Sequence, residues 1–309
     1  MRALAAALLG AVAVLAPTGC GLGAGPTPSA VQLLVTREFG ARRVGGTGPL
    51  KVSGQETVMS LLMRNHRVET RFGGGFVQSI DGLSGGEETG RPVDWFYYVN
   101  GVEAPRGAAA TNVLPGEHIW WDRHDWSQAE GVPAVVGSFP EPFLGGVEGK
   151  RLPVRIECES VSGNACQTVD EQMAKLGIPA AVSAAGGGVA GPETLRVLVG
   201  TWLNVDSDPA THTIAEGPRA SGVYARFSPD GRTLTLLDQD GRPVRTLTSG
   251  AGLIAATRTG EAAPVWAVTG TDQAGVQDAA RGLDTATLED RFAVALLGSE
   301  SLGLPVVGR

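Results

Sequence analysis

The sequence predicts an α+β protein built of two unlike halves. In the first, up to about residue 127, a strand, a helix and then a run of hairpins follow one another. In the second, residues 131–309, continuous apolar strands alternate with helices, which is typical of an α/β sheet covered on both faces. A length of 309 residues suits two domains, and the Pro- and Gly-rich stretch 130–151 forbids a long helix between them.

The N-terminus predicts export followed by lipid attachment. An apolar run at residues 3–16 is short for a membrane-spanning helix and is typical of a signal sequence. Cys20 follows small residues in a pattern similar to a bacterial lipobox, although Pro17 stands where that pattern usually has Leu. We therefore expect a lipoprotein signal peptide at 1–20, lipidation at Cys20 and a tether at 21–29, so that the protein is anchored to the outer face of the cell membrane. The alternative is an ordinary cleaved secretory signal.

The first folded half is predicted to occupy residues 30–127. A strand at 31–36 precedes a helix at 53–63, whose apolar side chains recur at spacings of three and four. Strands at 67–72 and 76–80 then flank a triple glycine. Strand, helix and hairpins in this order agree with a β-grasp-like fold. The glycine-rich, acidic segment Leu83 to Pro92 is expected to be a mobile surface loop.

Aromatic residues gather in two further strands of this half, at 94–99 and 118–124. The first ends in Asn100-Gly101, a strong signal for a tight hairpin because both central positions of that turn need positive φ. Side chains alternate along a strand, so neighbouring rings point to opposite faces.

So many amphipathic rings exceed the needs of a core, which favours a binding surface. Trp95 and Tyr97 share one strand face, whereas Trp120 and Trp121 lie on opposite faces of theirs. We expect one face of the sheet to pack on the core and the other to stay uncovered for a flat organic ligand, with at most two of these four rings touching it. The alternative is that the rings only fill the core.

Four stretches of this half carry a family resemblance, namely residues 79–82, 94–101, Gly107 and residues 116–120. In order and spacing they resemble the bacterial DUF4430 domains, which are similar to the C-terminal β-domain of transcobalamin and intrinsic factor. The resemblance covers about residues 30–126 and implies a β-grasp-like fold of the soluble-ligand-binding type. In the vertebrate carriers that domain closes over one side of cobalamin. The resemblance thus implies a cobalamin-type corrinoid as the leading ligand.

On this interpretation the rings supply contact area, while Asp81, Asn100 and backbone groups supply hydrogen bonds. The candidate ligand-binding residues are Asp81, Gly82, Trp95, Tyr97, Asn100, Trp120, Trp121 and His124.

A metal site in this sheet is not expected. His118, Asp122 and His124 project to one side of a strand, but residues four apart on a strand lie about 13 Å apart and cannot share a tetrahedral ion. A single histidine, His118 or His124, could still contact the cobalt of a corrinoid or a ligand amide. We expect no metal and no resident cofactor.

The second half gives a fold prediction and little about function. Cys158 and Cys166 are expected to form a disulfide outside the cytoplasm. Two strands end in small polar runs, at 200–201 and 269–272, where open α/β sheets bind ligands, although Thr271 or Asp272 could simply be an N-cap. Strands are predicted at 132–136, 152–158, 195–199, 223–227, 233–237, 253–257, 265–268 and 292–297, and helices at 168–176 and 274–283.

Composition narrows the function. A formal charge of −7 without a Lys/Arg cluster argues against nucleic acid as a partner. The sequence contains no nucleophile elbow, phosphate loop or paired His-Glu motif, so we expect no enzyme. The predicted function is a cell-surface lipoprotein that binds a soluble ligand, a corrinoid by resemblance, for uptake by a membrane transporter. The alternative is an interaction or structural module of the envelope that binds a protein or a cell-wall polymer.

Overall fold

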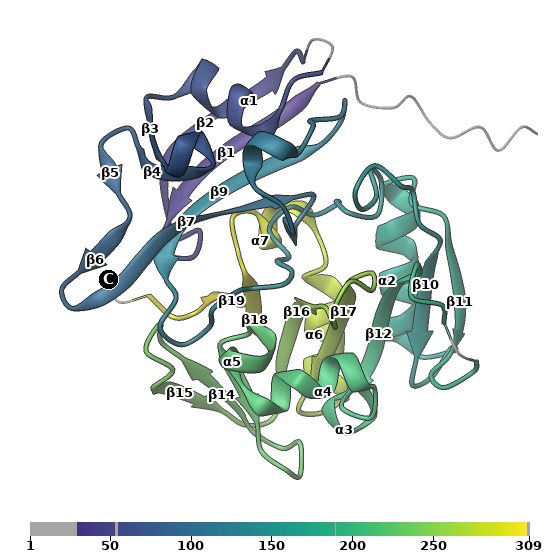
Figure 1. Cartoon of the computed structure of the whole chain (residues 1–309). Coiled ribbons are helices and arrows are strands. Elements are labelled where there is room, and N and C mark those ends of the chain that lie inside the picture. Colours follow the sequence, from purple (N-terminus) through teal and green to yellow (C-terminus); the bar gives the residue numbers. More distant parts are fainter. Residues whose placement is uncertain (1–29, 53–54, 189, 308–309) are drawn as a thin grey trace, which may run out of the picture.

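The computed structural model describes residues 30–52, 55–188 and 190–307 (Figure 1). The predicted signal peptide at 1–20, the lipidation site Cys20 and the tether at 21–29 lie outside these residues. Among the helices within them, none has the length and apolar character needed to cross a membrane. The predicted α+β class is confirmed, because helices and strands alternate along the described chain.

The first half, in the upper part of Figure 1, is a mixed sheet with a helix on one face. Two strands in the middle of the sheet, which are its first and last along the chain, pair in parallel, and the other pairings are antiparallel. The sheet runs in the order β2 (Arg42–Leu50), β1 (Val31–Arg37), β9 (His118–Asp125), β7 (Arg91–Val99), β6 (Gly86–Glu88), with β8 (Val102–Glu103) beside β7. Helix α1 (Val58–Asn65), the turns η1 (Phe72–Gly74) and η2 (Ala108–Ala110), and a small sheet of β3 (Val68–Arg71), β4 (Phe76–Ile80) and β5 (Leu83–Ser84) complete it.

Local chemistry explains where these elements begin and end. Asn100 and Gly101 have φ of 53° and 77°, as the predicted hairpin turn between β7 and β8 requires. Helix α1 begins at Val58, later than predicted, because Thr57 and Ser60 form a capping box there. The prediction that 83–92 is a loop is wrong, since this segment supplies β5, β6 and the start of β7.

The second half is a seven-stranded sheet whose first four strands in spatial order are parallel. The remaining strands pair in antiparallel fashion, so the predicted covered sheet is mixed. The order is β11 (Ala180–Ala184), β10 (Val154–Cys158), β12 (Leu195–Thr201), β17 (Val265–Gly270), β16 (Ala251–Thr257), β18 (Ala293–Leu297) and β19 (Glu300–Leu304).

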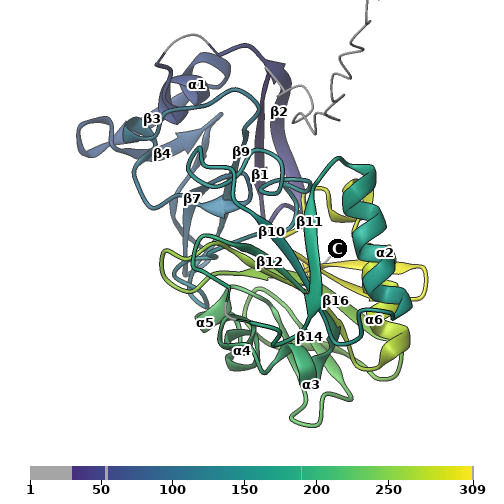
Figure 2. The same cartoon turned by 90° about the vertical axis from the view of Figure 1, so that its right-hand side faces the viewer.

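Both faces of this sheet are covered, as predicted (Figure 2). One face packs against α2 (Asn164–Lys175), α6 (Gln273–Arg281) and α7 (Thr285–Leu288). Over the other face lie α3 (Trp202–Val205), α4 (Pro209–Glu216), α5 (Pro218–Ser221) and a small sheet of β13 (Ala225–Phe227), β14 (Leu234–Leu237) and β15 (Pro243–Leu247). The predicted strand at 132–136 is wrong: these residues are buried but make only an isolated bridge, through Ala134 to Val102.

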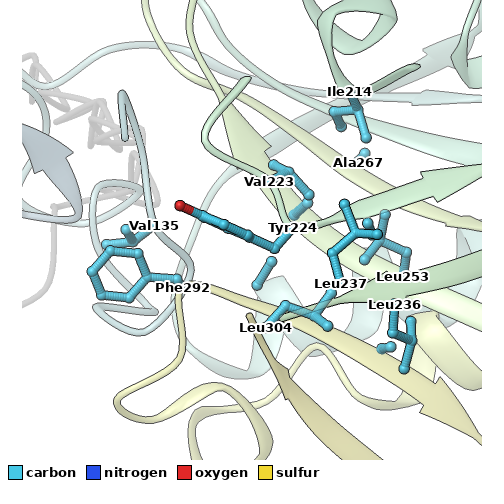
Figure 3. Close-up of a cluster of buried hydrophobic side chains, with 14 of the residues drawn as sticks. Val135, Ile214, Val223, Tyr224, Leu236, Leu237, Leu253, Ala267, Phe292 and Leu304 are labelled. Atoms are coloured by element: carbon cyan, nitrogen blue, oxygen red, sulfur yellow. The ribbon is translucent and has the colours of Figure 1, made fainter. Parts of the chain in front are cut away.

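The two halves share one buried cluster. It joins Trp120 and Tyr98 of the first sheet to Tyr224 and Phe292 of the second half, with Val135 between them. Figure 3 shows Phe292 beside Val135, with Tyr224 reaching towards both from the core of the second half. The aromatic sheet is therefore packed against the rest of the chain.

The predicted disulfide between Cys158 and Cys166 is present, with 5.9 Å between the two Cα atoms. It ties the end of β10 to the first turn of α2. Such a bond persists in oxidising compartments and indicates an extracytoplasmic location.

Replacing both cysteines, Cys158→Ala with Cys166→Ala, should lower the free energy of unfolding. The bond closes a short loop (sequence separation 8) and lowers the entropy of the unfolded chain, which stabilises the folded state by about 2.5 kcal/mol. Urea unfolding of the oxidised protein and of the double variant measures the difference. Equal stabilities would show that the bond contributes nothing to the fold.

Candidate functional site

One face of the aromatic sheet packs on α1. Trp95, Tyr97 and Trp121 belong to a buried cluster with Val58 and Leu61 of that helix. Tyr97 stacks on Trp121 with 4.9 Å between ring centroids, and its hydroxyl donates to the carbonyl of Arg106. These rings form the core of the first half.

The opposite face packs on the second half. Phe292 lies edge-on to Trp120 at 5.2 Å and to Tyr98 at 5.5 Å, centroid to centroid. His124 is sandwiched between Phe39 at 4.5 Å and Phe96 at 4.4 Å. This second layer comes from a segment far along the chain, which the sequence pattern of the first half could not reveal.

The expectation of an uncovered ring face is therefore wrong. Trp120 is 0% exposed, Trp121 2% and His124 2%. Trp95 and Tyr97 are also buried, at 6% and 9%. On the Trp120 side the cluster combines Leu34 and Phe39 of the first half with many side chains of the second, so the second half completes the burial of these rings. The alternative, that the rings fill a core, describes the observed packing.

Buried hydrogen bonds within the first half position the side chains that face this interface. The carboxylate of Asp122 accepts from the backbone N–H of Gly40 at 2.8 Å and of Phe39 at 3.1 Å, and His124 Nδ1 lies 2.8 Å from it. Trp120 Nε1 donates to Thr36 Oγ1 at 2.7 Å. His124 is thus engaged inside the protein, away from any ligand.

The other candidate residues shape turns. Asp81, at φ 51°, and Gly82, at φ 87°, connect β4 to β5. Asp81 accepts from the N–H of Arg67 at 2.9 Å and lies 2.7 Å from His66 Nδ1. Although burial opposes it, hydrogen bonding to His66 and Arg67 lowers the pKa of Asp81.

Asn100 is 1% exposed and positions its neighbours. Its Nδ2 donates to the carbonyl of Gly146, and its Oδ1 accepts from the N–H of His118, both at 2.9 Å. Asn100 therefore fixes the start of β9, where His118 lies.

Truncating the Phe292 ring, which seals the interface, should destabilise the protein. Phe292→Ala is expected to lower the free energy of unfolding by about 3 to 5 kcal/mol, because it leaves a cavity against Trp120 and Tyr98. Phe72→Ala is the matched control, since that ring is 86% exposed and its loss should change stability by less than about 0.5 kcal/mol. Denaturant unfolding measures the stability of both variants. If Phe292→Ala lowered the free energy of unfolding as little as Phe72→Ala, the Trp120 face of the sheet would not be sealed in solution.

A cavity lies between the halves near His118, the first residue of β9. This crevice has a volume of about 550 Å³ and is lined by Arg43 and Gly45 of β2, by His118, and by Ser138 and Glu141 of the connecting segment. At its rim Arg43 pairs with Asp290 and, at 2.7 Å, with Glu289, and both the Arg43 and Glu289 side chains are more than half exposed. The volume is within the usual range for small-molecule sites.

Two titratable groups facing the crevice have shifted pKa values. Burial lowers the pKa of His118 to about 4, so its imidazole is neutral at physiological pH. Burial raises the pKa of Glu141 to about 7, with a smaller contribution from the charge of Glu117. A neutral base and a carboxyl that titrates near neutrality are typical of functional sites.

Several polar atoms here lack partners. Within residues 30–52, 55–188 and 190–307 the buried hydroxyls of Thr47 and Ser138 make no hydrogen bond. In the same described stretches, neither imidazole nitrogen of His118 is hydrogen-bonded to another group. Buried polar groups normally find partners, so the orphaned hydroxyls of Thr47 and Ser138 point to an occupant, whereas the partly exposed imidazole of His118 can be solvated.

The strand ends of the second half are internally satisfied. Asp272 caps α6 by accepting from the N–H of Gly275 at 2.9 Å, and Thr201 donates to Glu159. Asp272 is therefore the N-cap of α6, the alternative that the sequence left open. His118 was a candidate from the sequence, whereas Glu141 was not, because the Phe-Pro-Glu-Pro-Phe run around it signals only a turn.

Among the comparisons with known proteins, a family model matches part of the first half. Residues 55–125 match the family model described as "Domain of unknown function (DUF4430)". The resemblance seen in the sequence is thereby confirmed for this part of the DUF4430 half. No curated protein matches the chain. Three chains among solved structures match, one of them the "putative metal binding protein from Ruminococcus gnavus ATCC 29149". It is 13% identical and aligns over 31% of this chain and 97% of that chain, with a TM-score of 0.26.

Removing the charge of Glu141 should stabilise the protein at high pH only. The folded-state pKa is about 7 against an ordinary 4.5, so stability is lost as pH rises between these values. The stability of Glu141→Gln relative to the natural protein should thus rise by up to about 3 kcal/mol between about pH 4 and pH 8. Thermal or urea unfolding across that range measures it.

Glu300→Gln supplies the control of opposite sign. Hydrogen bonding to Arg245 lowers the pKa of Glu300, so the charge of Glu300 stabilises the fold as pH rises. The free energy of unfolding of Glu300→Gln should therefore fall relative to that of the natural protein as pH rises. A pH-independent difference for Glu141→Gln would mean that Glu141 is ionised normally.

Proposed function

We propose that this protein binds a small soluble ligand outside the cytoplasm, in the crevice between its halves. The observation that carries the proposal is His118, a partly buried, neutral imidazole that faces a cavity of about 550 Å³ and whose two ring nitrogens make no hydrogen bond in the described chain. Asn100 fixes its backbone, which gives the imidazole a defined position. Such preorganisation favours binding.

The crevice offers a ligand both acceptors and donors. Glu141 presents a carboxyl that is 7% exposed, and Ser138 and Thr47 present unused hydroxyls. A ligand rich in amide groups would satisfy these atoms. The proposal is one of binding and not of catalysis, because the sequence offers no nucleophile motif.

A cobalamin-type corrinoid is the specific ligand that the family resemblance supports. It carries amides at its edge and a cobalt that accepts imidazole, and His118 is the available imidazole. The aromatic rings no longer support this ligand, since they are buried. A corrinoid would occupy the crevice in part and project from it, in a position suited to transfer to a membrane transporter.

The test is an absorbance titration with aquocobalamin, whose cobalt-bound water is displaced as the cobalt–nitrogen bond to imidazole forms. We expect a saturable change in the visible spectrum that His118→Ala abolishes. His212→Ala is the matched control, because this histidine on α4 is exposed and paired with Asp206 at 3.0 Å. Its loss should leave the titration unchanged.

Two results would overturn the proposal that the ligand is a corrinoid. A spectral change lost in His212→Ala would indicate surface coordination. No saturable change would favour the alternative, a structural or interaction module of the envelope. The observation behind that alternative is the sealed aromatic interface, which joins both halves into one scaffold.

A further inference from the structure

Glu117 lines the crevice and also a second, smaller cavity of about 290 Å³. The walls of this second cavity are mainly apolar and include Val99, Val102, Ala104 and Leu114. Glu103 lines it as well. We call it the acidic pocket. Its size suits a compact organic molecule with one apolar side.

Two carboxyls of the acidic pocket, those of Glu103 and Glu117, form no ion pair with a cation in the described chain. Glu117 is 5% exposed, and its Oε2 accepts from the N–H of Leu114 at 2.8 Å. In the part of the chain that the structure describes, neither Glu103 nor Glu117 takes part in an ion pair. Burial raises the pKa of both carboxyls. An unpaired buried carboxylate is unfavourable, so each would gain from a positive partner.

The cation nearest the pocket is engaged at its rim. Arg106 is 67% exposed in its side chain, and its guanidinium lies 3.7 Å from Glu148. Three carboxyls therefore line the cavity against one arginine, and the arginine is paired away from Glu103 and Glu117. The interior is left with negative charge beside apolar walls.

We propose that the acidic pocket binds an organic ammonium ion. The ammonium group lies against the carboxylate of Glu117, whose Oε1 has no hydrogen-bond partner in the described residues, and the apolar body packs on Val99, Ala104 and Leu114. Glu103 adds a second negative charge. A bare metal ion fits less well, because calcium or magnesium needs six or more oxygen ligands and these walls are apolar. The acidic pocket and the crevice are two cavities that share Glu117 as a lining residue.

The test compares phenethylammonium with 2-phenylethanol, its neutral analogue, by isothermal titration calorimetry on the full exported protein. Phenethylammonium should bind saturably and more tightly than the alcohol. Glu117→Gln keeps the acceptor for Leu114 but loses the charge, and should weaken ammonium binding at least about ten-fold. Glu103→Gln should weaken it by a smaller factor. Neither change should weaken binding of the alcohol.

Glu171→Gln, an exposed carboxylate on α2, is the matched control and should leave the ammonium affinity unchanged. Circular dichroism and thermal unfolding establish that the Gln variants fold. Equal affinity for the ammonium and the alcohol, or an unchanged ammonium affinity in Glu117→Gln, would overturn the proposal. Neither result bears on the aquocobalamin titration, which reads His118.

Discussion

The packing of Trp120 against Phe292 is the contact on which the arrangement of the two halves depends. It requires the backbones to approach closely. A Cβ at Gly40 would lie 2.0 Å from the carbonyl oxygen of Asp290, and a Cβ at Gly137, in the second half, would lie 2.8 Å from the indole ring of Trp120. Any side chain at either position would push the halves apart and expose the indole. Gly40 also has φ of 80°, which glycine adopts without strain.

This contact also creates the crevice. The halves are in close contact at Trp120 and separate towards the start of β9, where His118 lies. The space between them is bordered by two kinds of group: the ion pairs of Arg43 at the rim, and the buried carboxyl of Glu141 inside. Burial that removes water from Glu141 and His118 is what shifts their pKa values. The same packing thus supplies both the cavity and its chemistry.

Much of the fold was predictable because its signals are local. Strand periodicity placed Trp95 and Tyr97 on one face of their strand and separated Trp120 from Trp121 on the next, as observed, and Asn100-Gly101 marked the turn. The site was not predictable in this way. Nothing near Trp120 in sequence indicates that Phe292 covers it, so a ring that completes a shared core looks the same as one that awaits a ligand. The role of Glu141 likewise arises from segments distant in the chain.

The position of Glu117 links the two proposed sites. Its charge contributes to the raised pKa of Glu141 in the crevice, while its carboxylate also lines the acidic pocket. An ammonium ion beside Glu117 would offset that charge and bring the pKa of Glu141 down, so more of Glu141 would be ionised near neutral pH. By linkage, a crevice ligand that prefers one protonation state of Glu141 would change the affinity of the acidic pocket by the same factor. Because the charge of Glu117 is the smallest of the influences on the pKa of Glu141, we expect this coupling to be weak, and it needs no movement of the halves.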